Sequence, residues 1–330
     1  MPSVTEVNRP DGVRLHVEEY GDPASPLTVV LLHGWTLDSR LWRHQIHGLP
    51  SALGAPAHII AFDLRGHGRS TACPPHTSTL AQLADDLDAV LTERAPTGRV
   101  VLVGHSMGGM TIMEYAHRHA AEFTARVAGV VLMCTTAEGT AHTTYGLAPG
   151  VAWAVRTLEI AGSALLARSG PWRPHRPVMP VLYPGVRWLG FGRVADPDAV
   201  RLTIGMIGNA RLATIGGFRP WIDQQDRVDS LIHMAAVPAA VLVGGLDRLT
   251  PQSYADTIVQ ALPHAEHVIF PDAGHMLPLE CPDGVTNAVA QICKRALSVP
   301  AIPTQVGPES TRRGLRERIR RTRATASDAA

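Results

Sequence analysis

The sequence has little lysine, few cysteines and no long apolar run. Lys294 is the only lysine among 30 basic residues, an imbalance that we interpret as coding bias toward arginine. The four cysteines are widely spaced and form no CxxC pair, which argues against disulfides and zinc and favours free thiols. No apolar run approaches the roughly 18 residues of a membrane span, and residues 1–26 hold five acidic residues instead of a signal peptide's apolar stretch. We therefore expect a soluble, cytoplasmic protein.

The charge balance gives no reason to expect a specific nucleic-acid partner. The 330 residues carry a formal net charge of +1 and are 45% hydrophobic, which excludes a wholly disordered chain. Residues 298–330 hold seven arginines against three acidic residues, a surplus of four that leaves the preceding 297 residues at −3. We expect this Arg-rich tail to be disordered. The alternative is a weak electrostatic contact of the arginines of residues 312–323 with an anionic membrane surface, which we favour over a contact with nucleic acid.

Short runs rich in Val and Leu alternate with segments of helical period. Such runs are typical of parallel strands buried on both faces, and their alternation with helices predicts an α/β fold. The predicted strands are residues 4–7, 13–20, 27–32, 59–62, 100–103, 127–133, 239–243 and 267–270. The predicted helices are residues 80–91, 107–119, 254–262 and 283–297. In the first helix we expect Asp85, Asp86 and Asp88 to face solvent.

The alternation of strands and helices stops over about residues 137–236. This stretch is too long for an ordinary connection, so we expect an inserted, mainly helical cap between two core segments, residues 1–136 and 237–297. It contains four of the six tryptophans. Their side chains either line an apolar pocket or form the core of the cap itself.

The strongest local motif is the G-x-S-x-G sequence around Ser106. Gly104 and Gly108 flank the serine, and the motif follows the apolar run at residues 100–103 and opens a helical pattern. A strand, a sharp turn and a helix form the context in which this motif presents a nucleophile. The small residues allow the strand and helix to pass closely, and the helix N-terminus favours developing negative charge. The alternative is a glycine-rich connection with an incidental serine.

A serine nucleophile needs a base and a third group that holds the base. Asp247 follows the predicted strand 239–243, and His275 follows the strand that ends at residue 270. Both therefore belong to the edge of the sheet where the carboxyl ends of strands gather and ligands bind. Either residue alone is unremarkable in a loop. The order Ser, Asp, His, each after a buried strand, is what indicates catalysis.

An oxyanion hole is the third requirement, and two backbone donors are in position to form it. The first is the N–H of Met107, directly after the serine. The second is the N–H of Trp35, in the His33-Gly34-Trp35 segment that follows the predicted strand 27–32. Gly34 permits a close approach of the backbone to the site.

Taken together, these motifs resemble those of the α/β-hydrolase superfamily, in its broad group of esterases, lipases and haloperoxidase-like enzymes. The matching segments are His33-Gly34-Trp35, Asp63 to Ser70, Gly104 to Gly109, Gly245-Leu246-Asp247 and Ala273-Gly274-His275. The resemblance implies a mostly parallel eight-stranded sheet with helices on both faces. It also implies that Ser106 is the nucleophile, His275 the general base and acid, and Asp247 the residue that orients the imidazole.

The resemblance also sets the chemistry that we expect. Epoxide hydrolases and haloalkane dehalogenases have an aspartate at the position of Ser106, so the serine argues against both. We expect cleavage of a small-molecule apolar ester through an acyl-enzyme, without cofactor or metal. The alternatives are hydrolysis of a carbon–carbon bond, lactone or thioester, perhydrolysis, or a ligand-binding protein that has lost turnover. His33, His67 and His105 are expected to act as scaffold, and His264 and His267 have no further metal ligand at suitable spacing.

Overall fold

An eight-stranded sheet forms the centre of the computed structural model, which describes residues 2–298 apart from the side chains of Arg176 and Val178. The strands are β1 (Ser3–Asn8), β2 (Arg14–Tyr20), β3 (Leu27–Leu32), β4 (His58–Phe62), β5 (Arg99–His105), β6 (Val127–Met133), β7 (Ala239–Gly244) and β8 (Glu266–Phe270). Their order across the sheet is β1-β2-β4-β3-β5-β6-β7-β8. Only the β1–β2 and β2–β4 pairs are antiparallel. This is the predicted α/β-hydrolase fold, and all eight predicted strands are present.

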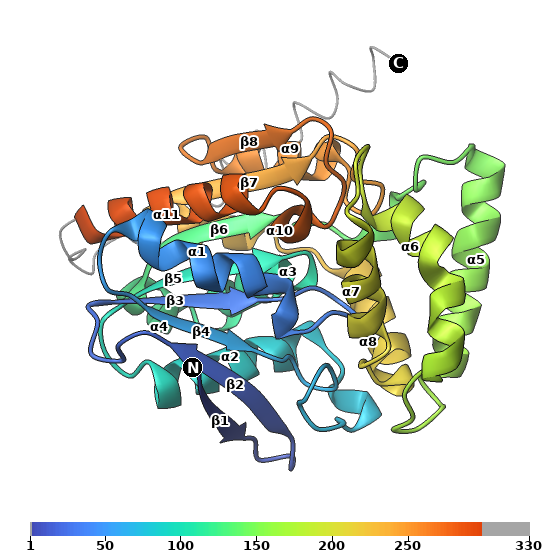
Figure 1. Ribbon diagram of the computed structural model, residues 1–330, viewed down its shortest axis with the longest axis horizontal. Helices are drawn as coiled ribbons and strands as arrows, with labels where there is room; N and C mark the ends of the chain where they lie inside the picture. Colours follow the sequence, from blue (N-terminus) through green and yellow to red (C-terminus); the bar gives the residue numbers. More distant parts are fainter. Residues whose placement is uncertain (1, 299–330) are drawn as a thin grey trace.

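Helices cover both faces of the sheet (Figure 1). Side chains alternate along β3, so that Val30 and Leu32 belong to one hydrophobic cluster and Val29 and Leu31 to the other. The first cluster includes side chains of α2 (Leu80–Arg94), α3 (Met107–Arg118) and α9 (Gln252–Ala261). The second includes those of α1 (Arg43–Leu53), α10 (Leu277–Glu280) and α11 (Pro282–Ser298). A further short helix, α4 (Ala120–Arg126), leads into β6.

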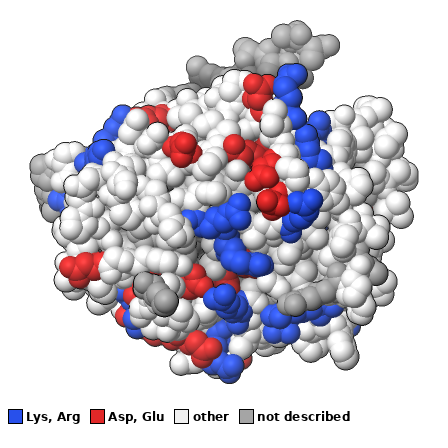
Figure 2. All heavy atoms as spheres, in the orientation of Figure 1, with Lys and Arg blue, Asp and Glu red and all other residues white. Residues whose placement is uncertain are grey.

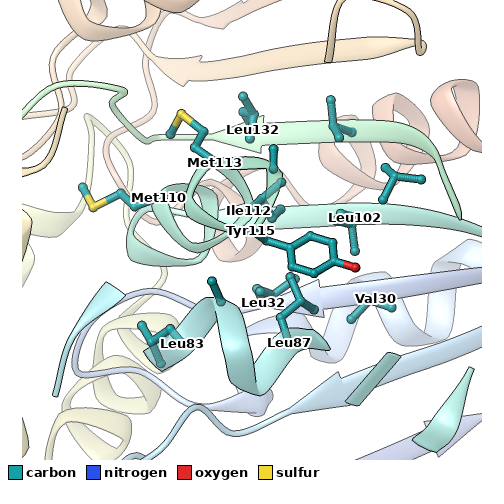
Figure 3. Close-up of a cluster of buried hydrophobic side chains, with 14 of the residues drawn as sticks. Val30, Leu32, Leu83, Leu87, Leu102, Met110, Ile112, Met113, Tyr115 and Leu132 are labelled. Atoms are coloured by element: carbon teal, nitrogen blue, oxygen red, sulfur yellow. The ribbon is translucent and has the colours of Figure 1, made fainter. Parts of the chain in front are cut away.

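The packing of α2 and α3 against the sheet holds the start of α3 in place. In Figure 3, Leu87 of α2 lies beside Tyr115 of α3, with Leu83 one turn away on α2 and with Leu32 and Leu102 of the sheet close by. All five side chains are fully buried. Burial of each Leu contributes roughly 1.5–3 kcal/mol relative to exposure. The turn that precedes α3 is thereby attached to a rigid layer.

The prediction that Asp86 faces solvent is wrong. Asp86 is fully buried, and its carboxylate accepts hydrogen bonds from Arg65 Nε at 2.6 Å and Nη2 at 2.7 Å and from Arg9 Nε at 2.9 Å. The two arginines come from 77 and 21 residues earlier in the chain. The helical period predicts that this carboxylate lies on the polar face of α2. It is buried instead because the two arginines, which come from distant segments, pair with it and compensate the loss of hydration.

Helix α1 was not predicted, and its composition explains why. Gly48 and Pro50 lie within it, and both residues lower helix propensity. Its buried side chains, among them Ile46, Leu49 and Leu53, join the same cluster as α11. Tertiary burial therefore overrides a weak local preference.

Helices alone make up the regular structure between β6 and β7 in the described chain. These cap helices are α5 (Pro149–Leu166), α6 (Tyr183–Gly190), α7 (Pro197–Ile207) and α8 (Leu212–Gln224), with short 3₁₀ turns between and beside them. They gather beyond one end of the strands, with α5 outermost (Figure 1). A single bridge between Glu138 and Asp226 brings the two ends of the stretch together. The division into core, residues 1–136 and 237–297, and cap, residues 137–236, stays a prediction.

Three further expectations concern the whole chain. All four cysteines are free thiols. Within residues 2–298, no helix combines the length and apolar character needed to cross a membrane. Apart from Ser298, which ends α11, the tail lies outside the described residues, so its disorder and its membrane contact stay predictions.

Candidate active site

Ser106 occupies a sharp turn between β5 and α3, as the motif predicts. Its backbone has φ 53° and ψ −119°, a conformation that costs a non-glycine residue about 1–3 kcal/mol. The surroundings hold it there: Ser106 N–H donates to the carbonyl of Met133 at 2.8 Å, and Thr135 Oγ1 donates to the carbonyl of Ser106 at 2.7 Å. The turn is therefore anchored to β6 and the residues that follow it.

The glycines on either side of Ser106 are required by close backbone contact. A Cβ at Gly104 would lie 2.5 Å from the backbone nitrogen of Gly109. A Cβ at Gly108 would lie 2.3 Å from the carbonyl oxygen of Leu32, at the end of β3. Neither position has space for a larger residue, because both contacts are with backbone atoms that cannot move aside.

His275 and Asp247 are hydrogen-bonded to each other on the loops that follow β8 and β7. His275 Nδ1 lies 2.8 Å from Asp247 Oδ2. The carboxylate also accepts the N–H of Leu249 at 2.8 Å, and both the N–H of Thr250 at 2.9 Å and its hydroxyl at 2.8 Å. A carboxylate that accepts these bonds fixes the tautomer with Nδ1 protonated, which leaves Nε2 as the acceptor.

The pKa of the Asp247 carboxyl reflects two opposing effects. Burial alone would raise it, but the adjacent His275 and the hydrogen bonds from Thr250 hold it below its usual value. Asp247 therefore remains ionised beside the imidazole. An anion in this position stabilises the imidazolium that forms when His275 accepts a proton.

Ser106 and His275 both line one cavity of about 430 Å³. This volume is typical of a small-molecule site. Most of the other lining residues are apolar, among them Trp35, Leu37, Met110, Val155, Val186, Trp188, Leu189, Ile207, Ile222, Leu249 and Met276. They come from the core loops and from the cap helices, so both parts of the chain enclose the site.

The two predicted oxyanion donors lie at the same end of the sheet as the serine. Met107 is the first residue of α3, so its N–H is one of the groups that have no partner within the helix. Trp35 follows β3, and a Cβ at its neighbour Gly34 would lie 3.0 Å from Ser106 Cβ. The 33–35 loop thus lies against the serine. The roles of the two N–H groups in catalysis stay proposals.

The three histidines expected to act as scaffold are buried and bonded to backbone. His33 Nδ1 donates to the carbonyl of Gly34 and Nε2 accepts the N–H of Leu64, which ties the loop after β3 to the loop after β4. His105 Nε2 lies 2.8 Å from the carbonyl of His275. Burial lowers the pKa of His33 to about 4 and that of His67 and His105 to about 3, so all three are neutral at physiological pH.

One group of described residues has the composition of a metal site: ligand atoms of His105, Cys134 and His275 lie within 4.8 Å of one another. Cys134 would have to bind as a thiolate, but burial and the nearby Asp247 raise the pKa of its thiol well above its usual value. His105 Nε2 and His275 Nδ1 are already engaged in the bonds described above. With its thiol held protonated, Cys134 is a poor ligand, and two histidines alone do not fit a metal centre.

Two residues that organise the site had not been singled out from the sequence. Thr250 binds both the Asp247 carboxylate and, at 3.3 Å, His275 Nδ1. The D-x-x-T spacing before Pro251 is a recognisable turn signal that could have identified it. Glu280 accepts the N–H groups of Gly274 at 3.0 Å and Met276 at 3.1 Å. No local pattern marks it, since its partners become neighbours only in the folded loop.

A polar cluster closes one part of the otherwise apolar cavity. Arg219 Nε donates to Glu159 at 2.6 Å and Nη1 to Asp223 at 2.5 Å, while the Tyr145 hydroxyl donates to Glu159 at 2.5 Å. Arg156 pairs with the other oxygen of Asp223 at 3.2 Å. Two arginines and two carboxylates balance, so the cluster presents no net charge to a ligand.

Comparison with known proteins places this geometry in a family. Residues 28–282 match the family described as alpha/beta hydrolase fold. Epoxide hydrolase A of Mycobacterium tuberculosis is 29% identical over 321 residues, which cover 85% of this chain and 94% of that protein. The probable oxidoreductase EphD of the same organism is 37% identical over 126 residues, but these cover 37% of this chain and only 20% of EphD.

A solved structure shares the architecture over nearly its whole length. A thermophilic esterase from Thermogutta terrifontis superposes with a TM-score of 0.70 at 25% identity, covering 89% of this chain and 99% of the esterase.

Proposed function

Because the chain belongs to the α/β-hydrolase fold family, we propose that it is a serine hydrolase that cleaves carboxylic esters of small apolar molecules. One observation carries the proposal: Ser106, on its strained turn, shares a cavity with His275, whose Nδ1 is held by Asp247. A binding protein would need neither the strained turn nor the ionised carboxylate behind the imidazole.

The geometry supports a two-step reaction. His275 Nε2 takes the proton of the Ser106 hydroxyl as its oxygen attacks the ester carbonyl, and the N–H groups of Trp35 and Met107 stabilise the oxyanion. The imidazolium then gives its proton to the leaving alkoxide, and the alcohol departs from an acyl-enzyme. In the second step Nε2 takes a proton from water, whose oxygen attacks the acyl carbon. The imidazolium then returns that proton to the Ser106 oxygen as its bond to the acyl carbon breaks, which releases the acid and regenerates the serine.

The cavity favours an uncharged, apolar substrate. Its wall is mostly aliphatic and aromatic, and its charged side chains, Arg219 and Glu159, already neutralise each other. A charged substrate would lose its hydration without gaining a free counter-charge. The volume of about 430 Å³ limits the substrate to esters with small or medium acyl and alcohol groups.

Epoxide hydrolysis, the activity named for one relative, requires a different nucleophile. An epoxide opened by the Ser106 oxygen would leave an alkyl ether on the enzyme, which water does not cleave. A carboxylate nucleophile would instead leave an ester, which water does hydrolyse. Ser106 is therefore compatible with acyl transfer and not with turnover of an epoxide.

A fluorophosphonate probe tests the proposal directly. We expect labelling of the parent and none of Ser106→Ala, together with turnover of p-nitrophenyl esters that depends on acyl length. Labelling without turnover of any ester would contradict ester cleavage. It would indicate that the same residues hydrolyse a carbon–carbon bond, a lactone or a thioester, or catalyse perhydrolysis. Absence of labelling in the folded parent would contradict a serine nucleophile.

The compartment is part of the proposal. We place the protein in the cytoplasm, and the four free thiols support a reducing compartment. Fractionation of cells that produce the full chain, with detection of the fluorophosphonate-labelled protein in each fraction, tests this placement.

A further inference from the structure

Helix α5 exposes an unusual number of apolar side chains. Trp153 is 71% exposed, Leu158 74% and Leu165 71%, and further exposed apolar residues on the helix are Val151, Val155 and Ile160. Figure 1 shows α5 as the outermost helix on the cap side, and Figure 2 shows that side as largely uncharged. A surface helix ordinarily turns its polar face to water. Here the apolar face is outside.

The inward orientation of the two charged residues explains this arrangement. Arg156 donates to the carbonyl of Thr140 at 2.8 Å and to Asp223, and Glu159 accepts from Arg219. A close contact with α8 locks the helix further, since a Cβ at Gly216 would lie 2.2 Å from the carbonyl of Ser163. Rotating α5 to bury its apolar side chains would break these bonds and leave paired charges unsatisfied.

The apolar surface continues beyond α5 along residues 167–194. Trp172 is 73% exposed, and Val181, Leu182, Trp188 and Val194 are also exposed. We call the exposed apolar residues of positions 151–194 the cap face. Tryptophan is the residue most suited to a boundary between apolar and aqueous phases, because its ring is apolar and its N–H is polar.

The charge of this segment has one sign. Residues 160–195 contain five arginines and no aspartate or glutamate. Arg193 pairs with Asp272 at 2.8 Å, but within residues 2–298 Arg168 and Arg187 have no carboxylate partner, and Arg173 donates only to the carbonyl of Gly68. The exposed apolar residues are therefore accompanied by three arginines whose charge no carboxylate of the described residues compensates.

We infer that the cap face docks on an anionic lipid surface, with α5 lying in the plane of the interface. Apolar residues beside arginines without acidic neighbours match a layer of anionic headgroups over acyl chains. A second copy of this chain matches less well, because a twofold contact would set the arginines of one cap face against those of the other. The inference concerns binding and holds independently of the ester proposal.

Docking would place the lipid next to the cavity. Val155 and Glu159 of α5 and Trp188 of α6 line the cavity that contains Ser106. The same helices thus separate the cavity from the cap face. An apolar substrate dissolved in the lipid would then enter the cavity without crossing water.

The experiment measures co-sedimentation of the full chain with vesicles that contain phosphatidylglycerol and with vesicles of phosphatidylcholine alone. We expect binding to the anionic vesicles. The double variant Trp153→Ser/Leu158→Ser should bind at least on the order of tenfold more weakly, because two apolar side chains are lost from the interface. Arg168→Gln should weaken binding about fivefold, since one cationic side chain near an anionic surface is lost.

Matched variants away from the cap face serve as controls. Val4→Ser and Ile269→Ser also remove exposed apolar side chains, and Arg14→Gln removes an exposed arginine. These should bind like the parent, and all variants should retain the parent's melting temperature and its activity on a soluble ester.

Three outcomes would overturn the inference. The parent fails to bind anionic vesicles, or the double variant binds them as tightly as the parent, which would assign binding to another part of the chain. The third is a concentration-dependent dimer that the double variant abolishes, which would identify a second copy as the occupant.

Discussion

Glu280 Oε2 accepts the backbone N–H of Gly192 at 2.6 Å, and this bond joins the segment after α6 to the loop that carries His275. The same carboxylate accepts the N–H groups of Gly274 and Met276, on either side of the histidine. The N–H groups of His275 and Met276 in turn donate to the carbonyl of Gly190. The position of the proposed base is thus fixed jointly by the core and by the cap helices.

Glu280→Ala should lower kcat on the order of tenfold with little change in KM, because the His275 loop loses its anchor while the apolar cavity is intact. The N–H groups of Gly192 and Gly274 lose their acceptor, at a cost of about 1–3 kcal/mol for each one that stays buried, whereas the N–H of Met276 keeps the carbonyl of Gly190. Steady-state kinetics on a soluble ester and thermal unfolding measure the two effects. Asp272→Asn, an exposed change in the same loop, is the control and should leave kcat unchanged. An unchanged kcat in Glu280→Ala would show that the loop holds His275 without the carboxylate.

Ser106→Ala should reduce kcat on the order of 10⁶-fold, since the covalent step is lost. Its fold should persist, because the backbone bonds of the turn do not involve the hydroxyl. Ser253→Ala, on the exposed side of α9, is the matched control. Residual turnover within a hundredfold of the parent would be incompatible with Ser106 as the nucleophile.

Asp247→Asn should reduce kcat on the order of 10⁴-fold, because an amide can donate to Nδ1 and favour the tautomer in which Nε2 is protonated and cannot act as base. Single-turnover kinetics should show slow acylation with near-normal substrate binding. Asp256→Asn, on α9 and outside the site, should behave like the parent. Normal acylation in Asp247→Asn would exclude Asp247 as the orienting group.

The lowered pKa of Asp247 predicts an acid dependence of stability. A carboxyl whose folded pKa lies below its unfolded value contributes stability above the unfolded pKa, about 3.9, and loses it as the pH falls through the folded pKa. The difference in free energy of unfolding between the parent and Asp247→Asn should therefore shrink as the pH falls below about 4. Urea unfolding at neutral and acid pH measures it, and a constant difference would show that ionisation contributes nothing.

Gly108→Ala should destabilise the fold by about 3 kcal/mol, since the new methyl group would overlap the carbonyl of Leu32. Gly162→Ala, in the middle of α5 with open space at its Cβ, should instead stabilise by roughly 0.5–1 kcal/mol. Denaturant unfolding of the two variants provides the comparison. Equal stability in both would contradict the close contact of the turn with β3.

Much of the fold could be predicted because its signals are local. A strand buried on both faces is a continuous apolar run, so β3 and β6 were predicted at their observed bounds. The turn at Ser106 could be predicted from the G-x-S-x-G motif. Its two glycines are needed locally, because the backbone around the turn has no space for a Cβ at either position. The buried position of Asp86 was not predicted. Its partners Arg9 and Arg65 lie far away in the chain, and the helical period of residues 80–91 carries no information about distant residues.

By itself, the sequence determined the positions of the strands along the chain and the turn at Ser106, because apolar runs and glycine spacing act on adjacent residues. It also placed Asp247 and His275 each after a predicted strand, and the structure shows that these two strands, β7 and β8, are neighbours whose loops meet. Only the tertiary structure decided which way α5 faces. Its hydrophobic pattern alone would bury Trp153, but ion pairs of Arg156 and Glu159 with α8, about sixty residues away, turn the charges inward and the apolar side chains outward.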